Sequence, residues 1–112
     1  MRALGRLPMG QMNNIEARYA AVLDADTDVV WYAFEAVKLM LAPNTSITID
    51  FFIMRASGLL EAVDLKGAKG IVTDDGWAKL KIAAALFPWV FKVAIPDAKK
   101  DGGWFVEEVG RA

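Results

Sequence analysis

The sequence predicts an α/β domain in which a central mixed β-sheet is flanked by helices. Two segments carry apolar residues at helical spacing, and five others are rich in the β-branched and aromatic residues typical of strands. The chain has 112 residues, 55% of them apolar, which suits one domain spanning residues 1–112 with a substantial core. The segments run helix, three strands, helix and two strands, and this α-β-β-β-α-β-β order favours a sheet with helical cover.

The first helix is expected within NNIEARYAAVLDAD, residues 13–26. Asn13 or Asn14 can serve as its N-cap. Glu16 lies in the first turn, where the helix dipole favours an anion. Apolar residues recur at helical spacing at Ile15, Tyr19, Ala20 and Leu23. Residues 1–12 are expected to form a flexible or partner-contacting arm.

Three strands follow this helix. DVVWYAFEAVKLML (28–41) predicts one long or bent strand because it is rich in β-branched and aromatic residues. Pro and Asn in APNTS (42–46) indicate a turn before a second strand, ITIDFFIM (47–54). RASG (55–58) then predicts a hairpin turn, so the third strand, LLEAVDLK (59–66), should pair antiparallel with the second.

A second helix is expected over GWAKLKIAAALF, residues 76–87. Thr73 can cap it, and Asp74 and Asp75 fall in its first turn. Its apolar stripe comprises Trp77, Leu80, Ala84 and Phe87, and Pro88 ends it.

Two final strands complete the predicted sheet. WVFKVAI (89–95) reads as a buried strand, and PDAKKDGG (96–103) as a polar turn. WFVEEV (104–109) predicts an edge strand.

Composition excludes several kinds of chemistry. The chain has no Cys and no His, which removes disulfides, zinc knuckles, thiol nucleophiles and catalytic triads that depend on His. No nucleotide-binding glycine loop is present, since GAKG (67–70) lacks the required length, and no organic cofactor is expected. No apolar stretch is long enough to span a bilayer, and the first residues lack a continuous apolar signal core, so we expect a cytoplasmic protein.

An acidic residue in an apolar strand gives the strongest functional signal. Asp50 lies within TIDFF, and burying a lone carboxylate costs several kcal/mol unless it is paired or binds a metal. The predicted hairpin brings Asp64 to the neighbouring strand, where two carboxylates would repel unless a cation lies between them. Mg²⁺ prefers such oxygen ligands. Lys66 shares a strand face with Asp64 and would point into the same pocket.

Each of these residues also has a simpler interpretation. Asp64 and Lys66 alone could form an exposed ion pair worth roughly 0–1 kcal/mol. The chain repeats the same spacing at Asp97 and Lys99, in a turn where a surface location is expected. Glu16 alone could simply stabilise its helix.

Two other acidic residues and the tryptophans are set aside. Glu61 should lie on the opposite strand face from Asp64, and Glu35 is on a different strand without a matching partner. The four tryptophans, Trp31, Trp77, Trp89 and Trp104, are expected in the core.

Taken together, the chain resembles the PD-(D/E)XK nuclease superfamily, and more closely the small phage endonuclease-like proteins related to junction-resolving endonuclease I. The similarity covers most of the chain from Met12 to Ile95. The stretches that carry it are MNNIEARYAAVLD, WYAFEAVKLMLAPNTSITIDFFIM, EAVDLKG and DDGWAKLKIAAALFPWVFKVAI, with GGWFVEE near the end. The resemblance implies a restriction-endonuclease-like core.

The resemblance also implies roles for particular residues. Asp50 and Asp64 would be metal ligands, with the Leu65 backbone carbonyl completing the site, and Lys66 would be the catalytic lysine. Glu16 would bind metal directly or through water. The residues assigned to DNA contacts are Lys79, Lys81, Lys69 and Arg6.

Two positions depart from the family pattern. Ile49 stands where the family usually has Pro, and this change removes no ligand. Asp64 replaces the more common Glu, which is one methylene longer, and this change is expected to slow the chemistry.

The resemblance therefore implies a Mg²⁺-dependent DNA endonuclease, with Mn²⁺ able to substitute. Branched DNA is the expected substrate and a homodimer the expected assembly, in a host cytoplasm if the protein is phage-encoded. The net charge of −1 means that DNA affinity must come from a local basic surface and should fall with salt. Two alternatives remain open. One is a catalytically weak or inactive nuclease-fold protein that binds nucleic acid, and the other is a nuclease that acts on RNA.

Overall fold

The computed structural model describes residues 12–66, 74–99 and 103–110. These residues form two helices and five strands in the predicted order, α-β-β-β-α-β-β. The elements are α1 (Asn14–Ala25), β1 (Val29–Ala42), β2 (Thr45–Arg55), β3 (Leu60–Leu65), α2 (Asp74–Leu86), β4 (Val90–Pro96) and β5 (Trp104–Glu108).

The five strands make one mixed sheet in the order β1-β2-β3-β4-β5. β1, β2 and β3 are antiparallel neighbours, and β5 is antiparallel to β4. β3 and β4 are parallel, because α2 carries the chain back across the sheet between them. β1 and β5 are the edges of this sheet, as was predicted for the last strand.

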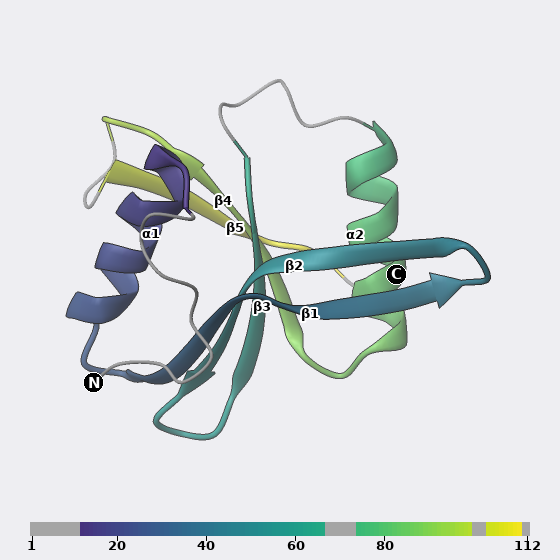
Figure 1. The fold of residues 1–112 in the computed structure, drawn as a ribbon, viewed down its shortest axis with the longest axis horizontal. Coiled ribbons are helices and arrows are strands. Elements are labelled where there is room, and N and C mark those ends of the chain that lie inside the picture. Colours follow the sequence, from purple (N-terminus) through teal and green to yellow (C-terminus); the bar gives the residue numbers. More distant parts are fainter. Residues whose placement is uncertain (1–11, 67–73, 100–102, 111–112) are drawn as a thin grey trace.

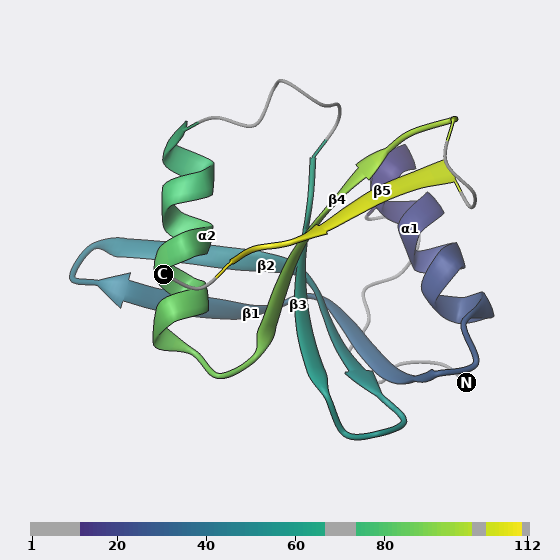
Figure 2. The same cartoon turned by 180° about the vertical axis from the view of Figure 1, so that it is seen from behind.

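The helices cover opposite faces of the sheet (Figures 1 and 2). Neighbouring residues of β3 show this division, since Ala62 belongs to the apolar cluster beneath α2 and Val63 to the cluster beneath α1. The far half of the β1–β2 hairpin runs beside α2, where Leu39 and Ile49 join Leu80 in one cluster. The sheet is thus a strongly twisted layer between two helices.

The helix signals in the sequence are largely confirmed. Asn13 caps α1, and Tyr19, Ala20 and Leu23 form its buried stripe. In α2, Leu80 and Ala84 are buried, and Trp77 packs at the margin of the same cluster. α2 ends at Leu86, just before Pro88, whereas the proposed cap at Thr73 lies outside the described residues.

The tryptophans are less deeply placed than predicted. All four are partly buried: Trp31, Trp77, Trp89 and Trp104. The last three pack against the margins of the two core clusters. Large indole side chains are often highly but not fully buried, as these four are.

Across the three described stretches of the chain, no helix has the length and apolar character needed to cross a membrane.

Candidate metal centre

The hairpin of β2 and β3 brings Asp50 and Asp64 together. The two strands pair as far as Phe51 and Val63, and one further step in this register sets Asp50 opposite Asp64. There the ladder changes: the Leu65 backbone N–H donates to the Asp50 carboxylate at 2.7 Å. The regular pairing of β2 with β3 therefore ends at the two acidic residues. There the Leu65 N–H donates to the Asp50 side chain and not to a backbone carbonyl of β2.

The same strand geometry directs a backbone oxygen to this point. In an extended strand the N–H and C=O of one residue leave the same edge. Because the Leu65 N–H points to Asp50, its carbonyl also faces the gap between β2 and β3. This is the oxygen that the sequence-based assignment adds to the site.

Asp64 and Lys66 form a close ion pair. The Lys66 Nζ lies 2.8 Å from Asp64 Oδ2, and the two side chains are only 23% and 11% exposed. Lys66 is held in place by its backbone N–H, which donates to the Ala94 carbonyl of β4 at 3.0 Å. The lysine is thus positioned beside the acidic pair, as the spacing predicted, and not on an open surface.

Glu16 comes to the site from α1. Its carboxylate accepts the Asn13 N–H at 3.0 Å, while the Asn13 side chain accepts the Glu16 N–H at 2.8 Å. This capping box fixes the side chain at the helix start. Glu16 therefore does stabilise its helix, as the simpler interpretation holds, and it also lies beside Asp50.

Glu35, which was set aside for want of a matching partner, does have acidic neighbours. Carboxylate oxygens of Glu35, Glu16 and Asp50 all lie within 4.8 Å of one another. The cause is an irregularity in β1, where the register with β2 shifts between Phe34 and Val37. Glu35 has a φ of 50°, a left-handed conformation that is rare for this residue type.

A β-bulge of this kind redirects a side chain. Two-residue alternation cannot locate a residue at such a bulge, which is why sequence reasoning missed Glu35. The available signal was a charged residue in the middle of an otherwise apolar strand, the same signal that singled out Asp50.

The electrostatics of the site combine a buried carboxylate with like charges. Burial, the hydrogen bond and charge interaction with Asp64, and the charge of Glu16 together raise the pKa of Asp50 to about 8. The Leu65 N–H acts in the opposite direction. A carboxyl group in these surroundings retains a proton near neutral pH unless a cation offsets the negative charge.

The residues fit a hard divalent cation. Mg²⁺ takes oxygen ligands at about 2.1 Å, which sets neighbouring ligand oxygens about 3 Å apart and opposite ones about 4.2 Å apart. The oxygens of Glu16, Glu35 and Asp50 already lie within 4.8 Å of one another, so changes in side-chain rotamer would bring them around such an ion. The best-formed oxygen set therefore contains Glu35, while Asp64 is engaged with Lys66.

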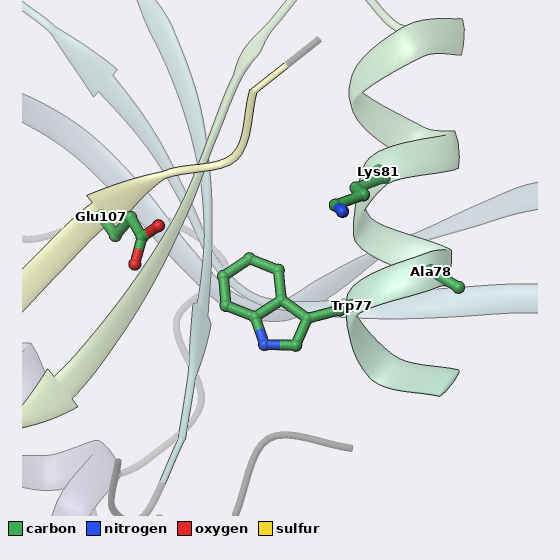
Figure 3. A pocket seen from close by; sticks show the side chains of 4 residues that line it. All are labelled: Trp77, Ala78, Lys81 and Glu107. Carbon is green, nitrogen blue, oxygen red and sulfur yellow. The ribbon is translucent and has the colours of Figure 1, made fainter. Parts of the chain in front are cut away.

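The basic residues assigned to DNA lie elsewhere or outside the described chain. Lys79 lies 3.9 Å from Asp75 in a helical ion pair. Lys81 lines a hollow between α2 and β5 with Trp77, Ala78 and Glu107 (Figure 3). Lys69 and Arg6 fall outside the described residues.

Glu61 and the Asp97–Lys99 repeat, which were not assigned to the site, have other partners. Glu61 lines a hollow with Tyr19 and Val22 of α1, and it binds Arg55 at 3.0 Å and Lys92 at 2.8 Å. The Asp97–Lys99 repeat of the motif lies in a turn, where the Asp97 side chain accepts the Lys99 N–H at 3.0 Å.

Comparisons with protein-family models, with curated proteins and with solved structures found no match to this chain. Assignment of a function thus depends on the side chains around Asp50.

Proposed function

We propose that this protein is a metal-dependent endonuclease that hydrolyses phosphodiester bonds in DNA. The observation that carries the proposal is the position of Asp50. Asp50 forms an acidic trio with Glu16 and Glu35, and it also interacts with Asp64, which is paired with Lys66. An oxygen-rich cation site beside a fixed ammonium group suits the hydrolysis of an anionic ester.

A Mg²⁺ ion held by the trio, with Asp64 and the Leu65 carbonyl as further candidate ligands, would supply charge neutralisation at the scissile phosphate. The protein's own residues would do the rest. Lys66 uses one of its three N–H donors on Asp64 and keeps others for a phosphate oxygen or the attacking water. Asp64 positions that ammonium group, because their contact is short and mostly buried.

The resemblance to the PD-(D/E)XK superfamily supports DNA as the substrate and a restriction-endonuclease-like core as the fold type. Branched DNA suits a homodimer, since two copies of the site could cut two strands. The near-neutral net charge requires that binding come from local basic groups, with Lys79 and Lys81 as candidates.

Nicking of supercoiled plasmid by the purified chain tests the proposal. We expect nicking with Mg²⁺ or Mn²⁺ and none with EDTA. Asp50→Asn and Lys66→Met should each lower the rate by at least a hundredfold, a typical cost of losing one charge-stabilising group.

Lys99→Met is the matched control, because Lys99 has the same spacing from an acidic residue but lies in an exposed turn. It should nick at the wild-type rate. Full activity in Lys66→Met would contradict the mechanism. DNA binding without nicking under either metal would favour the binding-only alternative, and cleavage of labelled RNA in place of DNA would favour an RNA nuclease.

A further inference from the structure

The hollow between α2 and β5 combines three chemically different groups outside the acidic site. Its walls are Trp77, Ala78 and Lys81 from α2 and Glu107 from β5. Figure 3 shows the indole projecting from the helix between the lysine and the glutamate. Lys81 lies one helical turn after Trp77, so the ammonium group and the indole share one side of α2.

The sheet register explains why Glu107 points into this hollow. Glu107 is the cross-strand partner of Val93, which is fully buried on the α2 face. Cross-strand partners project to the same side of a sheet. Glu108, the next residue, is paired with Lys92 and projects to the other side.

The two charges in the hollow do not neutralise each other. Within the described parts of the chain, no ion pair joins Lys81 to Glu107 or to another residue. An ammonium and a carboxylate held apart beside an aromatic ring suit a ligand with an anionic end, a flat body and N–H donors. A purely cationic ligand would be repelled by Lys81, and a purely anionic one by Glu107.

We propose that this hollow binds an unpaired guanine nucleotide. The base would stack on Trp77, since indoles bind bases through their π-faces. Two adjacent N–H donors on the Watson–Crick edge of guanine would meet both oxygens of Glu107, and the phosphate would meet Lys81. This assignment rests on the proposed function only for the source of the nucleotide, an unpaired position in the nucleic-acid substrate.

The test is a ¹⁵N NMR titration of the full chain with deoxynucleoside monophosphates in EDTA. Loss of one indole signal in Trp77→Phe assigns the Trp77 resonance. We expect dGMP to shift that resonance and the Lys81 and Glu107 amides, and to bind roughly tenfold more tightly than TMP, which offers a single N–H donor.

Matched variants then separate the contacts. Glu107→Gln should weaken dGMP about tenfold and remove the preference over TMP, whereas Glu108→Gln, on the opposite face, should leave both unchanged. Lys81→Met should weaken both nucleotides by a similar factor. Equal binding of dGMP and TMP, an unaltered preference in Glu107→Gln, or equal shifts with L-phenylalanine would each overturn the proposal.

This test and the nicking test fail independently. Because the titration is done without metal, dGMP should bind Asp50→Asn as it binds the wild type. Binding of dGMP by a chain that never nicks DNA would overturn the nuclease function and retain the guanine site. Nicking without preferential dGMP binding would do the reverse.

Discussion

Asp50 and Glu61 are carboxylates on adjacent inner strands, and their surroundings are opposite. Asp50 faces other acids, and burial together with Asp64 raises its pKa to about 8. Glu61, whose side chain is 4% exposed, lies between Arg55 and Lys92. Burial alone would raise the pKa of Glu61, but hydrogen bonds from these two cations outweigh it and hold that pKa below its usual value.

The contrast separates two uses of buried charge. Around Glu61 the charges are balanced: Arg55 also binds Asp26 at 2.7 Å, so the network ties β2, β3 and β4 to the end of α1. Around Asp50, among the residues that the structure describes, Glu16, Glu35 and Asp64 gather beside the ammonium group of Lys66. The first arrangement can stabilise the fold alone, whereas the second is stable at neutral pH only with a proton or a cation.

The largest expected effect on stability is from Glu61→Gln. It leaves Arg55 and Lys92 without their shared counter-ion, and breaking a buried pair typically costs 3–5 kcal/mol. Because these cations are 19% and 25% exposed, we expect the lower end, about 3 kcal/mol, in urea unfolding. Glu108→Gln is the surface control and should change stability by less than about 0.5 kcal/mol. An equally small change in the stability of Glu61→Gln would contradict a stabilising role for the Glu61 network.

The next effect is on the pH dependence of stability in EDTA. Between its usual pKa of 3.8 and about 8, Asp50 holds a proton in the folded chain and has lost it in the unfolded chain. Its contribution therefore becomes less favourable as pH rises through this window. The stability of Asp50→Asn relative to the wild type should therefore rise steadily from pH 4 to pH 8, measured by thermal unfolding.

Glu61 should show the opposite trend when thermal unfolding is followed over the same pH range in EDTA. Its pKa is lowered, so its stabilisation is present above the usual 4.5 and lost as pH falls through the folded pKa. The loss of stability caused by Glu61→Gln should therefore become smaller at acidic pH. Parallel pH curves for wild type and Asp50→Asn would contradict the account of the acidic site.

A smaller effect is expected from Mg²⁺ at neutral pH. When free Mg²⁺ exceeds its dissociation constant tenfold, binding to the folded state alone adds about 1.4 kcal/mol of stability. Calorimetry should show this rise for wild type and Glu108→Gln, and not for Asp50→Asn or Glu35→Gln. An unchanged rise in Glu35→Gln would exclude that residue from the cation site.

The smallest effect concerns the left-handed residue of β1. A non-glycine residue in the left-handed conformation costs roughly 1–2 kcal/mol. Glycine avoids this cost, but it loses more backbone entropy on folding, which offsets part of the gain. Glu35→Gly should therefore raise stability by about 0.5 kcal/mol while abolishing stabilisation by Mg²⁺. Asn44→Gly is the matched control, since Asn44 has a φ of 60° in a hairpin turn and tolerates it well. Destabilisation by Glu35→Gly alone would show that the Glu35 side chain holds the bulge.

Local signals were enough to predict the order of elements and the meeting of Asp50 with Asp64. Both depend on residues close in sequence: the turn at residues 55–58 sets the hairpin, and alternation places Lys66 beside Asp64. Glu35 was missed because a bulge interrupts that alternation. The ion network of Glu61 could not be foreseen because Lys92 is brought to it by the parallel pairing of β3 with β4, which forms only after α2 crosses the sheet.

The placement of Glu61 and Asp64 on one short strand constrains how this protein can evolve. Odd spacing along β3 sends the two acids to opposite sides of the sheet. If one residue were inserted between them, one of the two acidic side chains would move to the opposite face of the sheet, whichever end of the strand kept its register. Descendants of this sequence can therefore exchange Ala62 or Val63 for similar residues, but insertions and deletions should accumulate in the connecting turns and not within this segment.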